Sequence, residues 1–318
     1  MNRLLIDGSY IFCRGYYGNA KCITRDGRAS GAVYGMLQML RGIRKKFPDY
    51  YMTVVWDNEP AYRKSVYAEY KANRVDNKVS NYSDQLRDMK EGLKALSLDQ
   101  AESPAEEADD VIATLTELYK KHDKVVICSA DKDFAQLVEY GTVVLCMPWN
   151  SSPGHKRKDG SSSEVYYDLE AVMEHWGVSP ESFVIYQALK GDEIDNIPSS
   201  VPNIKKITVE YICQKYNSLE NLYKNLEKDT VLTQTIKKKF LAAKEAVFRN
   251  LRLVTLRKDL EVSVVPGHKD VGKFMELVNK YDIKVIDEKY PDIMETDRFS
   301  NRTGIIYKMN TISNMVTV

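Results

Sequence analysis

The segment from Ser103 to Leu137, SPAEEADDVIATLTELYKKHDKVVICSADKDFAQL, constrains the fold more than any other part of the chain. Apolar residues at helical spacing predict a helix with one buried face: Ala108, Val111, Ile112, Leu115 and Leu118. Ser103 and Glu106 match a capping box and Pro104 suits a first helical position, so we expect the helix to begin there. Lys124–Cys128 is a short, apolar and β-branched run that predicts a buried parallel strand.

Acidic residues are concentrated in this segment at Glu107, Asp109, Asp110, Asp131 and Asp133. Acids near a helix N-terminus interact favourably with the helix dipole, which is an alternative role for Glu107. That role explains Asp109 and Asp110 less well, because Asp is unfavourable inside a helix. It does not explain two aspartates directly after a buried strand. We therefore favour a site for hard divalent cations, which take oxygen ligands.

Two other predicted strands also end at an aspartate: Leu4–Ile6 precedes Asp7, and Met52–Trp56 precedes Asp57. In an open parallel sheet, ligands bind beyond the carboxyl ends of the strands, so Asp7, Asp57 and Asp131 are expected to converge on one crevice. One such aspartate is ordinary turn chemistry, but three are harder to explain in that way. The pattern predicts an α/β fold with a mostly parallel central sheet flanked by helices.

The segment that follows the second strand, residues 61–100, interleaves bases with tyrosines, among them Arg63, Lys71, Arg74, Tyr67 and Tyr70. This mixture is typical of a surface that follows a nucleic-acid backbone and stacks bases on its rings. A solvated helical excursion explains the segment alone equally well. The binding interpretation gains weight from the acidic site predicted beside it.

Composition sets further limits. The 318 residues carry 46 Lys+Arg and 45 Asp+Glu, a net charge of +1, which argues against a uniformly basic nucleic-acid binder. The five cysteines show no paired spacing, so we expect free thiols in a reducing compartment. The N-terminus enters a strand directly and no apolar stretch could span a bilayer, so a cytoplasmic protein without membrane contact is expected.

The second half of the chain is mainly helical by pattern. We expect helices at Leu169–Trp176, Pro180–Lys190, Ile204–Tyr216 and Thr233–Leu256, and a strand at Thr142–Pro148 paired with Tyr166 and Tyr167. Asp192 and Asp195 lie in the intervening GDEIDNIP and could be two more oxygen ligands or ordinary caps. Past Asp287 the pattern weakens, apart from a possible edge strand through Gly304–Tyr307. A carboxylate-rich crevice rimmed by bases suits metal-dependent phosphoryl chemistry, as in a nuclease or phosphatase.

Five stretches then carry a resemblance to a known family: LLIDGSYIFCRGYY, VYAEYKANR, EEADDVIATL, SADKDFAQLV and GDEIDNIP. In this order they resemble the flap endonuclease / 5′-3′ exonuclease family, which includes the 5′-nuclease domain of DNA polymerase I and stand-alone bacteriophage enzymes. The resemblance spans residues 3–260 and implies a PIN-like or resolvase-like catalytic domain over residues 1–165, with a mobile arch over residues 62–99. It further implies a helical DNA-binding region with a helix–hairpin–helix-like element over residues 166–290, and a C-terminal extension over residues 291–318.

The resemblance also implies a chemistry: hydrolysis of phosphodiesters at DNA 5′ flaps and 5′ ends, or in RNA–DNA hybrids, with two Mg²⁺ ions that Mn²⁺ can replace. The implied metal ligands are Asp7, Asp57, Glu107, Asp109, Asp110, Asp131, Asp133, Asp192 and Asp195. Lys71 would touch the scissile phosphate with Arg14 facing it, Arg63 and Arg74 would hold neighbouring phosphates, and Tyr70 would stack on or brace a base. A monomer acting in bacteriophage DNA replication or primer removal, in the host cytoplasm, fits the family.

One stretch departs from the family pattern. The family's helix–hairpin–helix reads G-V-x-G-I-G-x-K, whereas this chain places Asn203 and Lys205 where two glycines are expected and Ile207 at the lysine position. The glycines allow the backbone to approach phosphate closely, so their loss argues against a potassium site here. Lys205 and Lys206 could supply charge to duplex DNA through their side chains instead.

Two other functions stay open from the sequence. A PIN-like metal-dependent ribonuclease would share the acidic crevice, although the arch and Asp192 with Asp195 speak against it. A non-catalytic DNA-junction binding protein would have to keep clustered carboxylates that repel one another without a metal. Cleavage of flap DNA compared with single-stranded RNA would separate these alternatives.

Overall fold

The computed structural model describes residues 1–74, 81–147, 165–294 and 305–307. These residues fall into two compact units. The first unit lies within Met1–Glu59, Asn77–Ala130 and Arg257–Val318, and the second within Pro60–Asp76 and Asp131–Leu256. Parts of the predicted arch (residues 62–99) and of the C-terminal extension (residues 291–318) lie outside the described residues.

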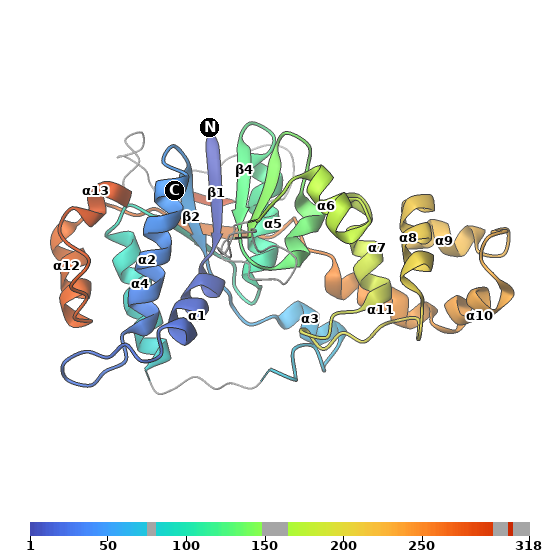
Figure 1. Ribbon diagram of the computed structural model, residues 1–318, viewed down its shortest axis with the longest axis horizontal. Helices are drawn as coiled ribbons and strands as arrows, with labels where there is room; N and C mark the ends of the chain where they lie inside the picture. Colours follow the sequence, from blue (N-terminus) through green and yellow to red (C-terminus); the bar gives the residue numbers. More distant parts are fainter. Residues whose placement is uncertain (75–80, 148–164, 295–304, 308–318) are drawn as a thin grey trace, which may run out of the picture. The chain divides into compact units, whose positions relative to one another are not determined.

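The first unit is built on a sheet with the strand order β4-β1-β2-β3-β7-β8. Figure 1 labels three neighbouring strands of this sheet, β4, β1 and β2. Four strands are parallel: β1 (Asn2–Asp7), β2 (Tyr51–Val55), β3 (Asp99–Glu102) and β4 (Lys124–Cys128). Two antiparallel strands, β7 (Val262–Val265) and β8 (Ile305–Tyr307), continue the sheet beyond β3. Leu5 lies opposite Thr53 on one side and Ile127 on the other, and all three side chains are buried. Burial on both faces explains why β1, β2 and β4 read as unbroken apolar runs.

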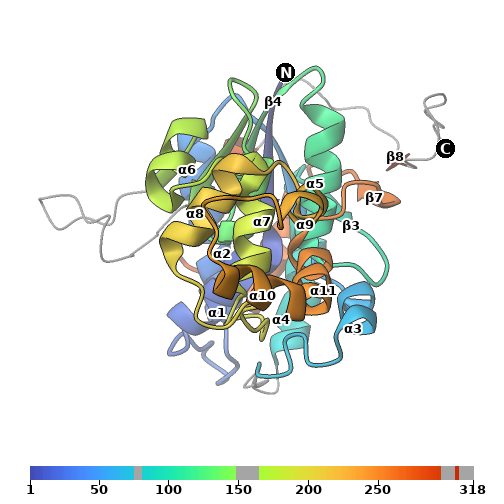
Figure 2. The same ribbon diagram turned by 90° about the vertical axis from the view of Figure 1, so that its right-hand side faces the viewer.

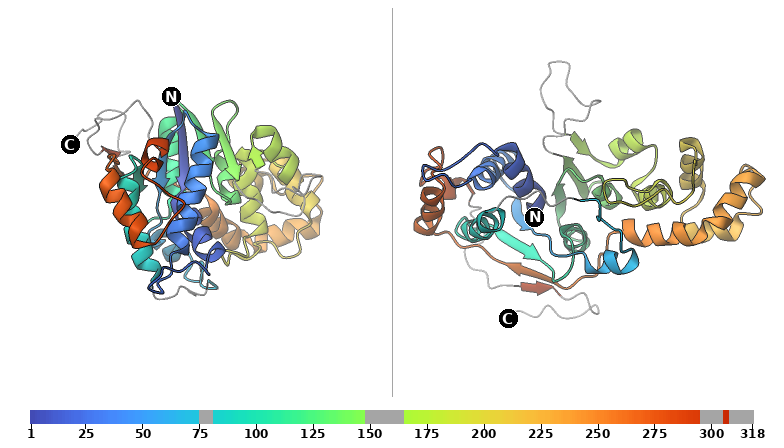
Figure 3. Two further views of the ribbon diagram at one scale, coloured as in Figure 1. Left: turned by 60° about the vertical axis from the view of Figure 1, so that its left-hand side comes forward. Right: turned by 90° about the horizontal axis from the view of Figure 1, so that it is seen from below.

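Helices of the first unit are α1 (Gly8–Gly18), α2 (Gly31–Lys46), α4 (Tyr82–Lys94), α5 (Ala108–Tyr119), α12 (Val271–Lys280) and α13 (Tyr290–Met294). Helix α4 contacts both α2 and α12 (Figure 3). Helices α1 and α2 approach closely at Gly15 and Gly35, where a Cβ on Gly35 would lie 2.6 Å from the Gly15 Cα. Glycine at these positions lets α1, the first helix after β1, pack tightly against α2.

The second unit is mainly helical (Figure 2). Its helices are α3 (Ala61–Val66), the 3₁₀ helix η1 (Lys132–Leu137), α6 (Leu169–Trp176), α7 (Pro180–Lys190), α8 (Lys206–Lys215), α9 (Leu219–Asn225), α10 (Gln234–Ala242) and α11 (Lys244–Val254). Strands β5 (Val143–Met147) and β6 (Val165–Tyr167) pair with each other, as predicted, and the structure shows them to be antiparallel. Helix α7 packs against η1, α8 and α11. The buried Asn250 of α11 donates hydrogen bonds to the Ala188 and Pro198 carbonyl oxygens and holds the end of α7.

The predicted helix start at Ser103 is wrong. Helix α5 begins at Ala108, with Glu107 as its N-cap residue. Ser103 instead follows β3, and its hydroxyl donates to the Glu261 carbonyl oxygen at 2.7 Å. The Glu106 carboxylate pairs with Arg257 rather than closing a capping box. Contacts with residues far along the chain therefore override the local capping signal.

The single helix predicted over Thr233–Leu256 is two helices, which is a second correction. Ala243 ends α10 and begins α11, and its N–H bonds to the Lys239 and Phe240 carbonyl oxygens. The Tyr223 hydroxyl also donates to the Phe240 carbonyl oxygen, at 2.9 Å. This carbonyl is the one that a continuous helix would offer to Lys244, so the α-helical ladder is interrupted there. In the part of the chain that the structure describes, no helix combines the length and apolarity that a membrane crossing requires.

Candidate functional site

In the first unit, Asp7 lies at the carboxyl end of β1, as predicted, and is fixed there. Its carboxylate accepts hydrogen bonds from the Tyr10 N–H and from the Ser129 hydroxyl, each at 2.8 Å. The first bond caps α1, because Asp7 is the N-cap residue of that helix. Ser129 directly follows β4, so adjacent strand ends jointly orient this carboxylate.

Tyr10 and Arg14 continue this arrangement along α1. The Arg14 guanidinium donates to the Tyr10 hydroxyl at 3.4 Å, and Arg14 is exposed. Burial raises the pKa of Tyr10, Arg14 opposes that increase, and Asp7 adds to it. Tyr10 therefore contacts the predicted phosphate ligand Arg14, and the Asp7 carboxylate affects the pKa of the same tyrosine.

Asp57 follows β2 and is exposed. One of its carboxylate oxygens accepts a hydrogen bond from the Ala108 N–H at 2.7 Å, and its own N–H donates to the Ser9 hydroxyl at 2.8 Å. Asp57 thus supplies the side-chain cap of α5 that was expected from Ser103. It joins the ends of β2 and α5, which both carry predicted metal ligands.

The acids at the start of α5 differ in their surroundings. Glu107 and Asp110 are buried and Asp109 is half-buried. One Asp110 oxygen accepts a hydrogen bond from the Arg257 N–H at 2.8 Å. Asp110 therefore already contributes to the fold by holding the chain segment that leads to β7, and its role as a metal ligand stays a prediction.

In the second unit, Asp131 and Asp133 open η1. Asp131 is its N-cap residue and accepts a hydrogen bond from the Asp133 N–H at 2.8 Å. Burial and the charge of Asp195 raise the pKa of Asp131. Burial, together with the charges of Asp131 and Asp192, raises the pKa of Asp133 well above its usual range. Both carboxylates are thus held where ionisation is costly.

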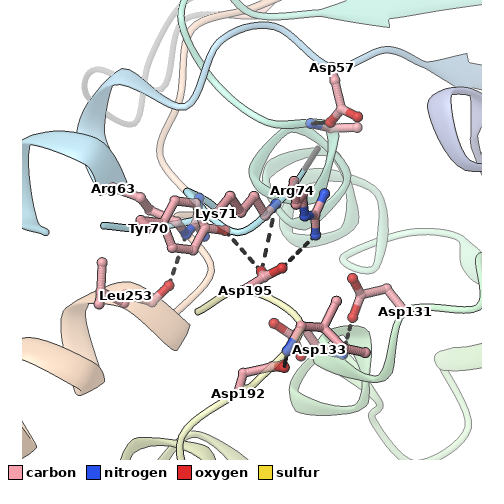
Figure 4. A network of polar contacts seen from close by, with 12 residues as sticks. Asp57, Arg63, Tyr70, Lys71, Arg74, Asp131, Asp133, Asp192, Asp195 and Leu253 are labelled. Carbon is pink, nitrogen blue, oxygen red and sulfur yellow. Dashed lines mark hydrogen bonds and ion pairs between the residues drawn. The ribbon is translucent and has the colours of Figure 1, made fainter. Parts of the chain in front are cut away.

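Asp192 and Asp195 lie in the loop after α7, which is closed by reciprocal backbone hydrogen bonds of 2.7 Å between Asp192 and Ile197. Lys132 pairs with the Asp192 carboxylate at 2.7 Å. Asp195 receives three groups from the segment after α3: the Tyr70 hydroxyl at 3.1 Å, the Lys71 ammonium at 3.6 Å and the Arg74 guanidinium at 2.5 Å (Figure 4). The structure therefore brings together a predicted metal ligand and three residues predicted to bind DNA.

Lys71 has an unusual backbone. Its φ of +56° lies in the left-handed region, and its N–H donates to the Asp195 carbonyl oxygen at 3.0 Å. A non-glycine residue in this region costs free energy and persists only where its surroundings enforce it. The Asp195 loop therefore fixes both the backbone and the side chain of Lys71.

Arg63 has a structural partner. Its side chain is 3% exposed, and its Nε donates to the Leu253 carbonyl oxygen at 2.8 Å. This hydrogen bond, which Figure 4 shows, connects α3 to α11. The predicted contact of Arg63 with DNA phosphates stays a prediction.

Lys205 and Lys206 are exposed at the start of α8, and Lys206 forms an i,i+4 ion pair with Glu210 at 3.5 Å. Asn203, at a position where the family pattern led us to expect glycine, has a φ of +56°. Asn tolerates this left-handed conformation better than most residues. The hairpin therefore keeps a left-handed residue at Asn203 without glycine, while the two lysines project their charge into solvent.

The described residues contain no group of three or more His, Cys, Asp or Glu side chains placed to hold a metal ion together. The four acids of the second unit nevertheless suit a hard cation, because their donors are all oxygen, and burial together with repulsion among them raises the pKa of Asp133. Lys132, Lys71 and Arg74 balance part of this charge. That all nine predicted acids share one site stays a prediction.

Two members of the second-unit network were missed from the sequence. Gln187 of α7 donates its side-chain amide to Asp133 at 2.5 Å, and Lys132 pairs with Asp192. Lys132 stands between Asp131 and Asp133, which is a usable signal. Gln187 is 54 residues from Asp133 inside a helical pattern, and nothing in its sequence context indicates the contact.

Two family models match the chain. The model described as "5'-3' exonuclease, N-terminal resolvase-like domain" matches residues 2–177, and "5'-3' exonuclease, C-terminal SAM fold" matches residues 178–275. The 5'-3' exonuclease of Aquifex aeolicus (strain VF5) is 34% identical over 264 residues, covering 82% of this chain and 83% of the relative. DNA polymerase I of Pseudomonas aeruginosa is 34% identical over 293 residues, which are 88% of this chain and 30% of the polymerase.

Solved structures agree on the fold. The bacteriophage T5 protein co-crystallised with metal ions has a TM-score of 0.62 at 19% identity, covering 93% of this chain and all of that one. A T5 flap endonuclease complex with DNA and metal ions has a TM-score of 0.61 at 19% identity, covering 92% of this chain and 98% of that one. The resolvase-like and SAM matches confirm the predicted α/β fold with a helical C-terminal region.

Proposed function

Because the chain belongs to the 5′-3′ exonuclease family and is a nuclease, we propose that it hydrolyses DNA phosphodiesters at 5′ flaps and free 5′ ends with two divalent metal ions. Magnesium is the proposed ion, and manganese can replace it. Support comes from the T5 flap endonuclease, whose structure was determined with DNA and metal ions. The proposed setting is removal of 5′ flaps or RNA primers during bacteriophage DNA replication.

The observation that carries this proposal is the group of second-unit carboxylates around Asp133. Burial and the negative charges of Asp131, Asp192 and Asp195 all raise the pKa of Asp133. A divalent cation bound among these oxygens would remove the repulsion and favour the ionised form. The proposed ligands are the nine acids Asp7, Asp57, Glu107, Asp109, Asp110, Asp131, Asp133, Asp192 and Asp195.

When bound, the metal ions would supply an activated water at neutral pH and stabilise an in-line displacement at phosphorus. The chain's own cations would bind the substrate. Lys71 and Arg74, which form ion pairs with Asp195, would donate hydrogen bonds to the scissile and neighbouring phosphates. Arg14 would approach from α1. The Tyr70 hydroxyl would keep Asp195 in place while these cations exchange partners. The products would be a 5′-phosphate and a 3′-hydroxyl.

Recognition of the duplex would involve a different part of the second unit. Lys205 and Lys206 at the start of α8 are exposed and could neutralise backbone phosphates. This element belongs to the proposed DNA-binding region over residues 166–290, and the proposed catalytic domain covers residues 1–165. Losing both lysines should weaken duplex binding in a salt-dependent manner.

The test is cleavage of a 5′-labelled flap DNA with magnesium and with EDTA, using wild type, Asp131→Asn and Asp110→Asn. We expect magnesium-dependent cutting near the junction that is lost in both variants, with circular dichroism unchanged. Asp259→Asn is the matched control, because Asp259 is exposed. Full turnover by both site variants would reject the site. Cleavage of single-stranded RNA in preference to the flap would favour the ribonuclease alternative.

A further inference from the structure

A groove of about 870 Å³ lies in the second unit, and none of the residues proposed above lines it. Its lining includes Val66 of α3 and six residues of α11: Lys244, Glu245, Ala246, Phe248, Arg249 and Arg252. Helices α3 and α11 are in contact along this part of the unit (Figures 1 and 2). We refer to this feature as the basic groove.

The basic groove has an excess of positive charge. Lys244, Arg249 and Arg252 line it together with a single acid, Glu245. Within the described part of the chain, none of the three cations forms an ion pair with a carboxylate. The arginine on α3, Arg63, is instead buried and holds the Leu253 carbonyl oxygen. The groove cations therefore do not balance acids of the fold.

Aromatic side chains set the positions of two of these cations. The Arg249 guanidinium lies 4.5 Å from the centre of the Tyr67 ring and also donates to the Asn250 side-chain oxygen at 2.9 Å. The Lys244 ammonium lies 5.5 Å from the centre of the Tyr223 ring. The half-buried Phe248 ring lies beside Tyr223, with ring centres 5.5 Å apart. Such contacts orient a cation without neutralising its charge.

Helical spacing places these groups in a row. Lys244, Phe248 and Arg252 follow one another at intervals of four residues on α11 and so share a face. Two residues eight positions apart in a helix are about 12 Å apart along its axis. Each strand of duplex DNA carries one phosphate per ~3.4 Å of helix axis, so a row of about 12 Å matches a run of about four phosphates.

We propose that the basic groove binds the phosphate backbone of a nucleic-acid strand outside the catalytic site, with Phe248 as a surface for a base or sugar. This inference rests on the proposed function, because it assigns a second contact to the same substrate. A row of unneutralised cations beside an aromatic ring suits a polyanion that carries planar bases. Single strands and duplexes both present this phosphate chemistry, and the experiment distinguishes them.

The test is binding of a fluorescent single-stranded oligonucleotide and of a fluorescent hairpin duplex, measured by anisotropy in EDTA over a range of salt concentrations. The variant is Lys244→Ala with Arg252→Ala. Losing two phosphate contacts should reduce the slope of log K against log salt by about 1.4 for a single strand or about 1.8 for a duplex. The probe whose slope changes identifies the strand that the groove holds.

The matched control is Lys121→Ala with Lys228→Ala, which removes the same charge from two exposed lysines outside the groove. Unchanged slopes for both probes in the groove variant would overturn the proposal, and so would equal losses in the control. Wild-type cleavage of flap DNA is measured in parallel. If wild type cleaves flap DNA but the groove variant leaves the salt slopes unchanged, only the role of the basic groove is rejected. If wild type neither binds nor cuts DNA, the proposed function is rejected as well.

Phe248→Leu provides an independent variant that keeps every charge. Base stacking on an aromatic ring corresponds to about 5- to 150-fold in affinity, so single-strand binding should weaken within that range while the salt slope stays unchanged. Circular dichroism melting confirms that each variant is folded before binding is measured. If Phe248→Leu binds both probes as tightly as wild type does, the Phe248 ring does not contact nucleic acid in the basic groove.

Discussion

Gln187 donates a hydrogen bond from its side-chain amide to the Asp133 carboxylate, while the oxygen of the same side-chain amide is buried with no hydrogen-bond partner among the described residues. Leaving a buried acceptor unsatisfied costs free energy. The nitrogen of the Gln187 amide is therefore directed at Asp133, although this leaves the amide oxygen without a hydrogen bond. This relationship identifies Gln187 as a positioning residue for a proposed metal ligand.

The first prediction concerns Gln187→Leu. Removing a group that orients a metal ligand typically weakens metal affinity or activity by about 10- to 100-fold. We therefore expect the magnesium concentration for half-maximal cleavage to rise by that factor. Stability should change by less than about 1 kcal/mol, because the lost hydrogen bond is offset by removal of the unsatisfied carbonyl.

Gln136→Leu is the matched control for this experiment. The Gln136 side chain bonds to the backbone of Val254 and Leu256 at 3.0 Å in each case, so it serves the fold of the second unit. The control should lower the melting temperature and leave the magnesium requirement unchanged. An unchanged magnesium requirement in Gln187→Leu would remove Gln187 from the site.

A second prediction concerns pH and the metal-free protein. Burial, Asp131 and Asp192 raise the pKa of Asp133 in the folded state. Above the usual carboxyl pKa of about 3.9, the folded protein therefore binds more protons at this group than the unfolded chain does. Stability contributed by protonated Asp133 is present at low pH and is lost as pH rises through the raised pKa.

Chemical denaturation of the metal-free protein from pH 4 to pH 8 measures this effect. Asp133→Asn should be more stable than wild type toward pH 8, and the difference should shrink toward pH 4. Magnesium should stabilise wild type at high pH and should do so less in the variant. A difference that does not depend on pH would contradict the raised pKa.

The third prediction separates the two roles of Lys71. At a φ of +56°, glycine is favoured over alanine, so Lys71→Gly should be more stable than Lys71→Ala by about 1 kcal/mol. Both variants lose the Lys71 ammonium, which forms an ion pair with the Asp195 carboxylate. Both should therefore reduce flap turnover by about 100-fold or more, with little change in DNA binding in EDTA.

Lys121→Ala, at an exposed lysine of the first unit, is the control for loss of one charge. Denaturation and single-turnover cleavage are measured on all three variants. Equal stability of the glycine and alanine variants would show that the backbone at Lys71 is unstrained. A pure loss of binding would remove Lys71 from the catalytic residues.

A fourth prediction concerns Asp229, a buried acid in the second unit. Burial raises its pKa, but hydrogen bonds from Lys215, Tyr216 and two backbone N–H groups outweigh burial and lower it overall. Its contribution to stability is therefore present above the usual carboxyl pKa and is lost as pH falls through the lowered value. Asp229→Ala should destabilise the protein by about 3 kcal/mol, because several buried donors lose their acceptor.

Asp259→Ala, at an exposed position, should change stability by less than about 0.5 kcal/mol. Urea denaturation near pH 7 compares the two variants with wild type. The ion pair with Lys215, whose side chain is 41% exposed, should matter less than the buried hydrogen bonds. High salt should therefore leave most of the difference between wild type and Asp229→Ala intact.

The sequence was informative where local pattern and burial agree. The apolar runs before Asp7, Asp57 and Asp131 are strands, and Pro180–Lys190 is the predicted helix. The helix start at Ser103 failed because the Ser103 hydroxyl is recruited by Glu261, whose position a capping motif does not encode. Tertiary partners of this kind lie beyond the reach of local patterns.

The residues of the candidate site were likewise predictable from the sequence only in part. Motif resemblance predicted Lys71, Arg74 and Asp195, and the structure places these three together in one network. Gln187 carried no signal, because the helical pattern around it is complete without a polar role. Side chains that orient a ligand from inside a helix are set by packing, which spacing alone does not reveal.

Strand β3 has a consequence for synthesis of the chain. Gln100 in β3 pairs with Val265 in β7, so one edge of β3 stays without its partner until a much later segment has been made. At ~5–20 residues per second, that wait lasts roughly 8 to 30 seconds on the ribosome. An open strand edge invites pairing with another chain. Strand β3 carries two acids, Asp99 and Glu102, and charged side chains on an unpaired strand oppose such pairing, so they should help to protect the nascent protein from aggregation.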